Sequence, residues 1–345
     1  KIALAVLLIC LSLFTNLILK DDPFDDSVLI EDEDIYLKNI KYVTVPTYHD
    51  NVKLQTIEMG RKDKPLILFL HGFPETALIS WHHQLQFFDE QYSDQYHILA
   101  PDMRGYNHSD KPETVNEYHL SYLVSDVHAI IHKYAGKKEA YIVAHDWGGI
   151  VAWAFARQFP DSVTKLIVLN GPDVPQEAKA LPSWDQIKKS WYIELFQLPT
   201  PLPEIRFSKN NFETLKKLYV SWNSGQVTKP VMKRLLQAWD EPGHLRANIN
   251  WYRSLLQGSI RQLLSPDPEI TKWKVNKTHV MRPTLLLWGV QDVCMVPETA
   301  NLSFESVHES VRGESDIVEY HDSGHFVQHE KYAEVNQQII NFLKY

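Results

Sequence analysis

The chain has 345 residues, of which 44% are hydrophobic, enough for one large domain with a buried core. Its formal net charge of −8 equals the charge of the eight acidic residues in segment 21–34, so the rest of the chain is neutral overall. This neutrality leaves no basic stripe for a nucleic acid, and we expect no nucleic-acid partner.

The chain opens with an apolar segment. Residues 2–19 carry no charge and are bounded by Lys1 and Lys20, a length at the threshold for a membrane-spanning helix. A signal peptide is the main alternative, but no small-residue cleavage site precedes the acidic run. We therefore expect a single-pass membrane anchor at 1–20 and a solvated, flexible acidic linker at 21–39. Because the first residue is Lys rather than Met, we also expect further sequence before it.

Strand-like and helix-like segments then alternate. Runs at 41–45 and 52–57 alternate in polarity and predict an antiparallel hairpin at a sheet edge, whereas the apolar run at 66–70 predicts a strand covered on both faces. Further strands are predicted at 96–100, 141–144, 163–169, 284–288 and 317–320, and helices at 118–134, 150–157, after Pro297 and at 331–342. The alternation predicts an α/β fold with a mostly parallel sheet flanked by helices.

The alternation of predicted strands and helices stops between residues 171 and 274. This stretch is rich in aromatic residues and prolines and has no clear strand, so it predicts a helical lid inserted after the sixth strand. The core is then expected to comprise residues 40–170 and 275–345.

Segment 141–149 predicts a buried strand, a tight turn and the start of a helix. Its small residues Ala144, Gly148 and Gly149 suit a sharp bend, in the form of the nucleophile elbow of α/β-hydrolases, which usually has serine at its tip. Here the tip is Asp146, whose carboxylate can attack an sp³ carbon and form an ester with the enzyme. Aspartate is also common in turns and helix caps, so the assignment depends on its partners.

An acid and a histidine are expected after such a nucleophile, in that order. Asp292 follows one predicted strand and His325 follows the next. Asp173 competes as the acid because it too follows a strand. His321 and His329 compete as the base, but the first lies at a strand end and the second in a helix. We favour Asp292 and His325.

Backbone N–H groups near the nucleophile are expected to form an oxyanion hole. Trp147 directly follows Asp146, and Phe73 lies in the loop after the third strand, where His71 is expected to be structural. We see no His/Cys cluster with metal-ligand spacing and no phosphate-binding glycine loop, so neither a metal nor a cofactor is expected.

Together these segments make the chain resemble the epoxide hydrolases of the α/β-hydrolase superfamily, over roughly residues 40–345. The resemblance rests on five motifs in order: His71–Glu75 (HGFPE), Asp102–Asn107 (DMRGYN), His145–Gly149 (HDWGG), Trp288–Asp292 (WGVQD) and Gly324–His325 (GH). Each motif alone is weakly specific, whereas five in the family's order are strongly specific.

The resemblance implies that the enzyme converts an apolar epoxide and water into a diol through an ester on Asp146. It also implies two lid tyrosines that donate hydrogen bonds to the epoxide oxygen, and the matching positions are Tyr192 and Tyr252. With its apolar first segment, the chain is most similar to the membrane-anchored animal members. This similarity implies a location in a membrane, that of the endoplasmic reticulum.

Three alternatives to an epoxide hydrolase can be weighed against these residues. A haloalkane or haloacid dehalogenase uses the same Asp–His–acid set, but Phe73 and the tyrosine pair favour an epoxide over a halide. A serine esterase is excluded by Asp146. A non-catalytic ligand-binding homologue would lack part of the catalytic set, whereas every expected residue is present.

Overall fold

The computed structural model describes residues 23–32, 35, 41–48, 52–136, 139–174, 183–258 and 277–344. Eight strands of this part form one sheet in the order β1-β2-β4-β3-β5-β6-β7-β8. They are β1 (Lys41–Pro46), β2 (Lys53–Gly60), β3 (Leu66–Leu70), β4 (His97–Pro101), β5 (Ala140–His145), β6 (Val163–Leu169), β7 (Thr284–Gly289) and β8 (Asp316–Tyr320). β2 is antiparallel to β1 and β4, and the remaining neighbours are parallel. The predicted hairpin and mostly parallel sheet are confirmed.

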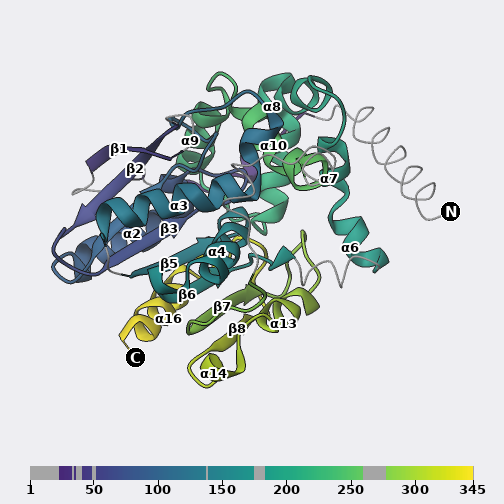
Figure 1. The fold of residues 1–345 in the computed structure, drawn as a ribbon. Coiled ribbons are helices and arrows are strands. Elements are labelled where there is room, and N and C mark those ends of the chain that lie inside the picture. The colour runs from purple at the N-terminus through teal and green to yellow at the C-terminus, as the bar shows by residue number, and fades with distance from the viewer. Residues whose placement is uncertain are drawn as a thin grey trace.

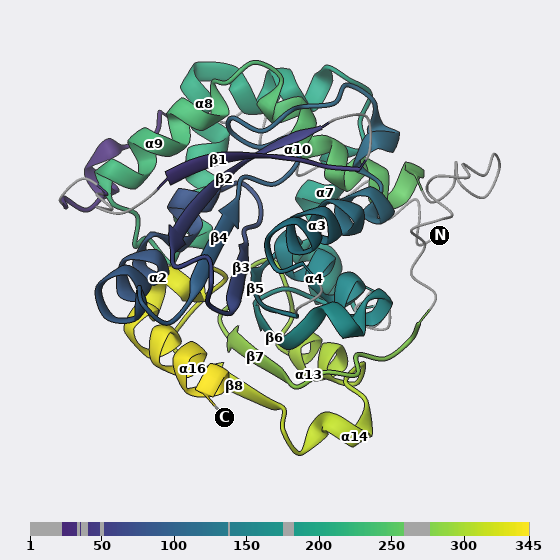
Figure 2. The ribbon, with the colours of Figure 1, turned by 60° about the vertical axis from the view of Figure 1, so that its left-hand side comes forward.

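Helices cover both faces of this sheet. The described helices outside the segment between β6 and β7 are α2 (Ala77–Tyr92), α3 (Leu120–Tyr134), α4 (Trp147–Gln158), α13 (Glu298–Phe304), α14 (Glu309–Arg312), α15 (Val327–Glu330) and α16 (Tyr332–Lys344). Figure 2 shows α2 and α16 on one side of the sheet and α3, α4 and α13 on the other. The fold is therefore a three-layer α/β arrangement.

The alternation of side chains along β3 explains why two layers of helices are needed. Leu66, Leu68 and Leu70 belong to the apolar core on one face, whereas Ile67 and Phe69 belong to the core on the other. All five are buried. A strand that is apolar on both sides is stable only when both faces are covered.

A helical segment lies between β6 and β7. Its described helices are α6 (Trp184–Lys189), α7 (Trp191–Phe196), α8 (Leu202–Trp222, interrupted at 209–212), α9 (Lys229–Trp239) and α10 (His244–Arg253). Figure 1 shows α7, α8, α9 and α10 together beyond one end of the sheet. Helices are thus observed at this point of the chain, while the lid and its limits of 171–274 stay a prediction.

Parallel pairing brings several loops to one place. β3, β5, β6, β7 and β8 run in the same direction, so their carboxyl ends meet at one edge of the sheet. That edge is where open α/β sheets bind ligands. The loops that carry the predicted site residues of the core all begin there.

Two expectations about the start of the chain need correction. Residues 1–20, on which the anchor prediction rests, lie outside the described residues, and no helix among the described ones is long and apolar enough to cross a bilayer. The membrane anchor and the endoplasmic reticulum location are therefore unsupported and do not stand.

The described part of the predicted linker is mostly exposed, and it contacts the helical segment at a few points. Ile30 forms a β-bridge with Thr228, and Leu29 is almost fully buried. The ammonium group of Lys229 binds the carboxylate of Glu31. The acidic run contains enough apolar side chains for this part to dock against the helical segment.

Candidate active site

Asp146 occupies the turn between β5 and α4 in a strained backbone conformation, with φ 50° and ψ −120°. Residues other than glycine rarely adopt such a positive φ, and backbone strain of this kind is concentrated at functional sites. The turn is tight enough that a Cβ on Gly148 would lie 2.3 Å from the carbonyl oxygen of Leu70. Position 148 thus requires glycine because α4 begins close to the end of β3.

The two carboxylate oxygens of Asp146 have different neighbours. Oδ1 accepts a hydrogen bond from the backbone N–H of Phe73 at 2.8 Å. Burial raises the pKa of this carboxylate, and the backbone N–H of Trp147 is among the groups that lower it. Oδ2 lies 3.6 Å from Nε2 of His325. One oxygen is therefore held by an amide, while the other faces the imidazole.

His325 follows β8 and lies between two carboxylates. Its Nδ1 is 2.8 Å from Oδ2 of Asp292, and its Nε2 faces Asp146. Burial lowers the pKa of His325, but the charges of Asp292 and Asp146 outweigh burial and raise the pKa to about 10. Burial raises the pKa of Asp146, but the hydrogen bond and charge of His325 bring it below its usual value. The resting site is thus an imidazolium between two carboxylates.

Asp292 is fixed from several directions. Its Oδ1 accepts from the backbone N–H groups of Cys294 at 2.6 Å and Met295 at 3.1 Å, and its Oδ2 accepts from the amide of Asn170 at 2.7 Å. The competing acid Asp173 instead forms an ion pair with Arg157. The geometry therefore pairs Asp292, and not Asp173, with the histidine.

Asn170 has no place in the sequence predictions, although it directly follows β6. Its side-chain oxygen accepts from the N–H of Gly289 at 2.8 Å, and its amide donates to Asp292. The sequence signal that could have identified Asn170 is a polar residue directly after a buried strand. Its partner becomes evident only once β6 and β7 are paired.

Tyr192 of α7 and Tyr252 of α10 are buried, and their ring centroids lie 5.9 Å apart. The ring of Tyr252 packs edge-on against Phe73 at 5.4 Å and Trp147 at 5.0 Å, beside the turn that carries Asp146. Burial raises the pKa of both phenols well above the usual value, and Asp146 adds to the effect. Both phenols therefore remain O–H donors at neutral pH.

The histidine of the first motif is structural, as expected. Nε2 of His71 accepts from the N–H of Met103 at 2.9 Å, so its Nδ1 carries the proton that is directed to the carbonyl of Gly72 at 3.0 Å. His145 makes a comparable contact, from its Nε2 to the carbonyl oxygen of His325 at 2.9 Å. These bonds hold the loops that carry the catalytic candidates.

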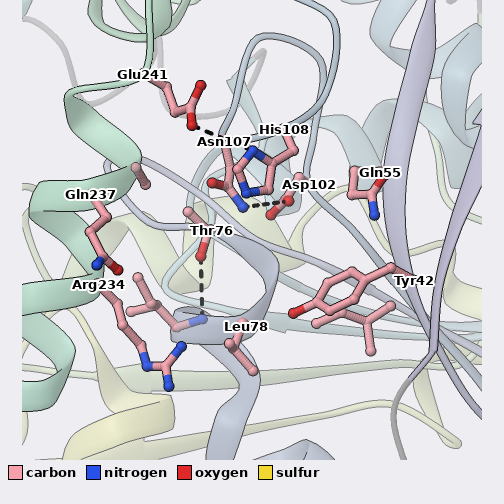
Figure 3. Close-up of a pocket in the computed structure, with 13 residues that line it drawn as sticks. Tyr42, Gln55, Thr76, Leu78, Asp102, Asn107, His108, Arg234, Gln237 and Glu241 are labelled. Atoms are coloured by element: carbon pink, nitrogen blue, oxygen red, sulfur yellow. Dashed lines mark hydrogen bonds and ion pairs between the residues drawn. The ribbon is translucent and has the colours of Figure 1, made fainter.

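A cavity of about 370 Å³ lies elsewhere, between β1, β2, the start of α2, the loop after β4, and α9. Figure 3 shows the polar side chains that line it, with Asn107 bonded to Asp102. It is lined by none of the expected catalytic residues. The carboxylates of Asp102 and Glu241 and the guanidinium of Arg234 all line it, so the cavity favours neither an anionic nor a cationic ligand.

Two clusters in the described part of the chain have the donor atoms for a metal ion. One comprises Asp292, Cys294 and His325 of the site itself. In this cluster Oδ2 of Asp292 and Nδ1 of His325 already bind each other at 2.8 Å, so these two donor atoms are engaged. The other comprises His82, His83 and His329, a group that the spacing of histidines in the sequence did not indicate.

Comparisons with known proteins agree with this geometry. The family described as alpha/beta hydrolase fold matches residues 65–332. An AB hydrolase superfamily protein, YfhM, of Bacillus subtilis is 34% identical over 86% of this chain and 96% of its own length. Epoxide hydrolase 1 of Caenorhabditis elegans is 33% identical over 85% of this chain and 68% of its own.

A solved structure also matches. The crystal structure of an epoxide hydrolase from Bacillus megaterium with an inhibitor has a TM-score of 0.71 and 28% identity. The match covers 88% of this chain and the whole of that one.

Proposed function

This chain belongs to the alpha/beta hydrolase fold family and is a hydrolase of the epoxide hydrolase group, and we propose that it forms vicinal diols through an ester on Asp146. The observation that carries the proposal is that the two oxygens of the Asp146 carboxylate have different neighbours. Oδ1 is held by the amide of Phe73, so Oδ2 is the oxygen left to attack. A carboxylate nucleophile at a strained turn, with an acid–histidine pair behind it, suits attack on an sp³ carbon.

In the first step, Oδ2 of Asp146 forms a bond to an epoxide carbon, and the bond from that carbon to the ring oxygen breaks. The ring oxygen gains negative charge as it leaves. The phenols of Tyr192 and Tyr252 donate hydrogen bonds to it and supply its proton. Donors already oriented in a buried site stabilise such charge more than water does. The product is a hydroxyalkyl ester of Asp146.

In the second step, water attacks the carbonyl carbon of the ester. Esterification removes the charge of Asp146, one of the two charges that raise the pKa of His325. The imidazolium therefore gives its proton to the phenolate left by the first step, and the neutral imidazole then takes a proton from the attacking water. The amides of Phe73 and Trp147 stabilise the tetrahedral oxyanion. Its collapse expels the diol oxygen, which takes the proton from His325, and the proton of the resulting Asp146 carboxyl returns to the imidazole.

The substrate class follows from the walls of the site. Tyr252 contacts Phe73, Trp147, Phe196 and Tyr192 through its ring. Aromatic walls of this kind favour apolar ligands, with a few polar groups fixing their orientation. We therefore propose apolar epoxides as substrates. Equal kcat/KM for small polar epoxides would contradict this choice.

Product analysis tests the reaction. The purified protein is incubated separately with an apolar epoxide and with a haloalkane of similar size, and diol and halide are measured. The proposal expects diol from the epoxide and no halide release. Halide release without diol would instead indicate a dehalogenase, and binding of the epoxide without turnover would indicate a ligand-binding homologue.

A further inference from the structure

Three histidines outside the catalytic centre lie together at the junction of α2 and α15. They are His82 and His83 of α2 and His329 of α15, all partly buried. One ring nitrogen of each lies within 4.8 Å of the others. The ring centroids of His82 and His83 are 3.9 Å apart, and those of His82 and His329 are 5.3 Å apart. The proposed hydrolysis uses none of them.

Hydrogen bonds fix the tautomers of two of these rings. Nδ1 of His82 lies 2.7 Å from the carbonyl oxygen of Ile79, which can only accept, so Nδ1 carries the proton and Nε2 the lone pair. Nε2 of His329 lies 2.7 Å from Oε1 of Glu75. A carboxylate oxygen accepts this hydrogen bond, so in neutral His329 the proton lies on Nε2 and the lone pair on Nδ1.

This is the arrangement that metal-bound histidines show. A histidine ligand usually donates its second N–H to a backbone carbonyl or a carboxylate, which orients the ring and makes the other nitrogen more basic. His82 has the carbonyl, and His329 has the carboxylate. In both, the second N–H is already engaged before any metal arrives.

The third ring is oriented by a different contact. His83 stacks on Tyr332 with centroids 4.2 Å apart and an interplanar angle of 16°, which leaves its two ring nitrogens unused. The centroid of its ring lies 3.9 Å from that of His82 and 6.1 Å from that of His329, so the stack holds it beside the other two rings.

We propose that His82, His83 and His329 bind one divalent transition-metal ion of the zinc class. Imidazole nitrogens suit this class, and three of them leave one position for water. Zn–N bonds of about 2.0–2.1 Å in a tetrahedron place the nitrogens about 3.4 Å apart, so the rings move together by roughly 1 Å on binding. Partly exposed side chains can move by this distance.

Such an ion would connect the catalytic loop to the rest of the core. α15 begins two residues after His325, so a metal shared with α2 holds the end of that loop. The same Glu75 that binds His329 accepts a hydrogen bond from Tyr219 of α8 at 2.6 Å. The metal would thus stabilise the junction at which α2, α15 and the helical segment meet.

Zinc titration of the untagged full chain tests the proposal. The protein is first stripped with a chelator, and ZnCl₂ binding is then measured by calorimetry beside the thermal midpoint with and without zinc. His83→Gln removes one ligand and leaves the His329–Glu75 bond intact, and His82→Gln removes a second. His321→Ala, at an exposed histidine outside the cluster, is the matched control.

We expect one zinc ion per chain and a higher midpoint in zinc for the wild type and the control. We expect at least about tenfold weaker binding, and no rise in the midpoint, for each glutamine variant, which circular dichroism should show to be folded. Two outcomes would overturn the proposal: no saturable binding to the wild type, or binding to both glutamine variants as tight as to the wild type. Neither readout depends on hydrolase activity.

Discussion

Nδ1 of His325 lies 2.8 Å from Oδ2 of Asp292, although the two residues follow different strands of the sheet. The bond leaves Nε2 of the imidazole directed at Asp146, 3.6 Å away. Asp292 therefore orients the imidazole of His325 toward Asp146. Most of the behaviour that we expect of variants follows from this relationship.

Replacing the histidine should separate the two steps. His325→Gln leaves Asp146 able to attack but removes the base that activates water. We expect a burst of about one epoxide consumed per chain and then almost no turnover, with the ester seen as added mass on the intact protein. Steady turnover without the added mass would show that the histidine is not the base.

The two phenols should act through their O–H groups and not through their rings. Tyr192→Phe and Tyr252→Phe keep the rings, and we expect each to lower kcat by about a hundredfold, because loss of one such donor costs roughly 10²–10³. Tyr118→Phe is the control, since its buried phenol donates to the carbonyl of Pro112, outside the site. Equal, small losses in all three variants would contradict the assignment.

Asn170 should act as a positioning residue. Its amide helps to lower the pKa of Asp292, which burial raises, and it connects the acid to the end of β7. Asn170→Ala should lower kcat roughly tenfold to a hundredfold, because small misplacements cost that much. It should also move the acidic limb of the kcat/KM profile to higher pH. An unchanged profile beside a lower thermal midpoint would indicate a structural role only.

Stability should depend on pH through His325. Its folded-state pKa, about 10, lies above the ordinary value of about 6.5 for histidine. The contribution of His325 to the free energy of unfolding is thus fully present below about pH 6.5 and is lost as the pH rises toward 10. Denaturant unfolding of the wild type and His325→Gln should show a difference in free energy of unfolding that shrinks across this window. A difference that grows with pH would contradict the ion pair.

The strands and the order of the catalytic candidates could be predicted from the sequence because both are local signals. Buried strands appear as apolar runs, such as 66–70, and the turn at Asp146 has its own small residues. The partner of Asn170 depends on the pairing of β6 with β7, which is not local. The same holds for His329, which meets His82 and His83 only after α15 packs on α2.

The N-terminal predictions had a different weakness. Composition alone suggested a solvated linker, but a few apolar side chains decide whether such a segment docks. In residues 23–32 the buried side chain of Leu29 and the backbone bridge of Ile30 make such contacts. An apolar run of threshold length likewise gave no sufficient ground for a membrane anchor.

The role of Asp146 is tested most directly by a single turnover in ¹⁸O-labelled water. The protein, in excess over an apolar epoxide, is allowed to react once, and the label is then located by mass spectrometry of the diol and of the peptide that contains Asp146. We expect the label in the Asp146 carboxylate and a largely unlabelled first diol, because the oxygen added to the substrate comes from the enzyme. Label in the first diol, with none in the peptide, would mean direct attack by water and would contradict the ester mechanism.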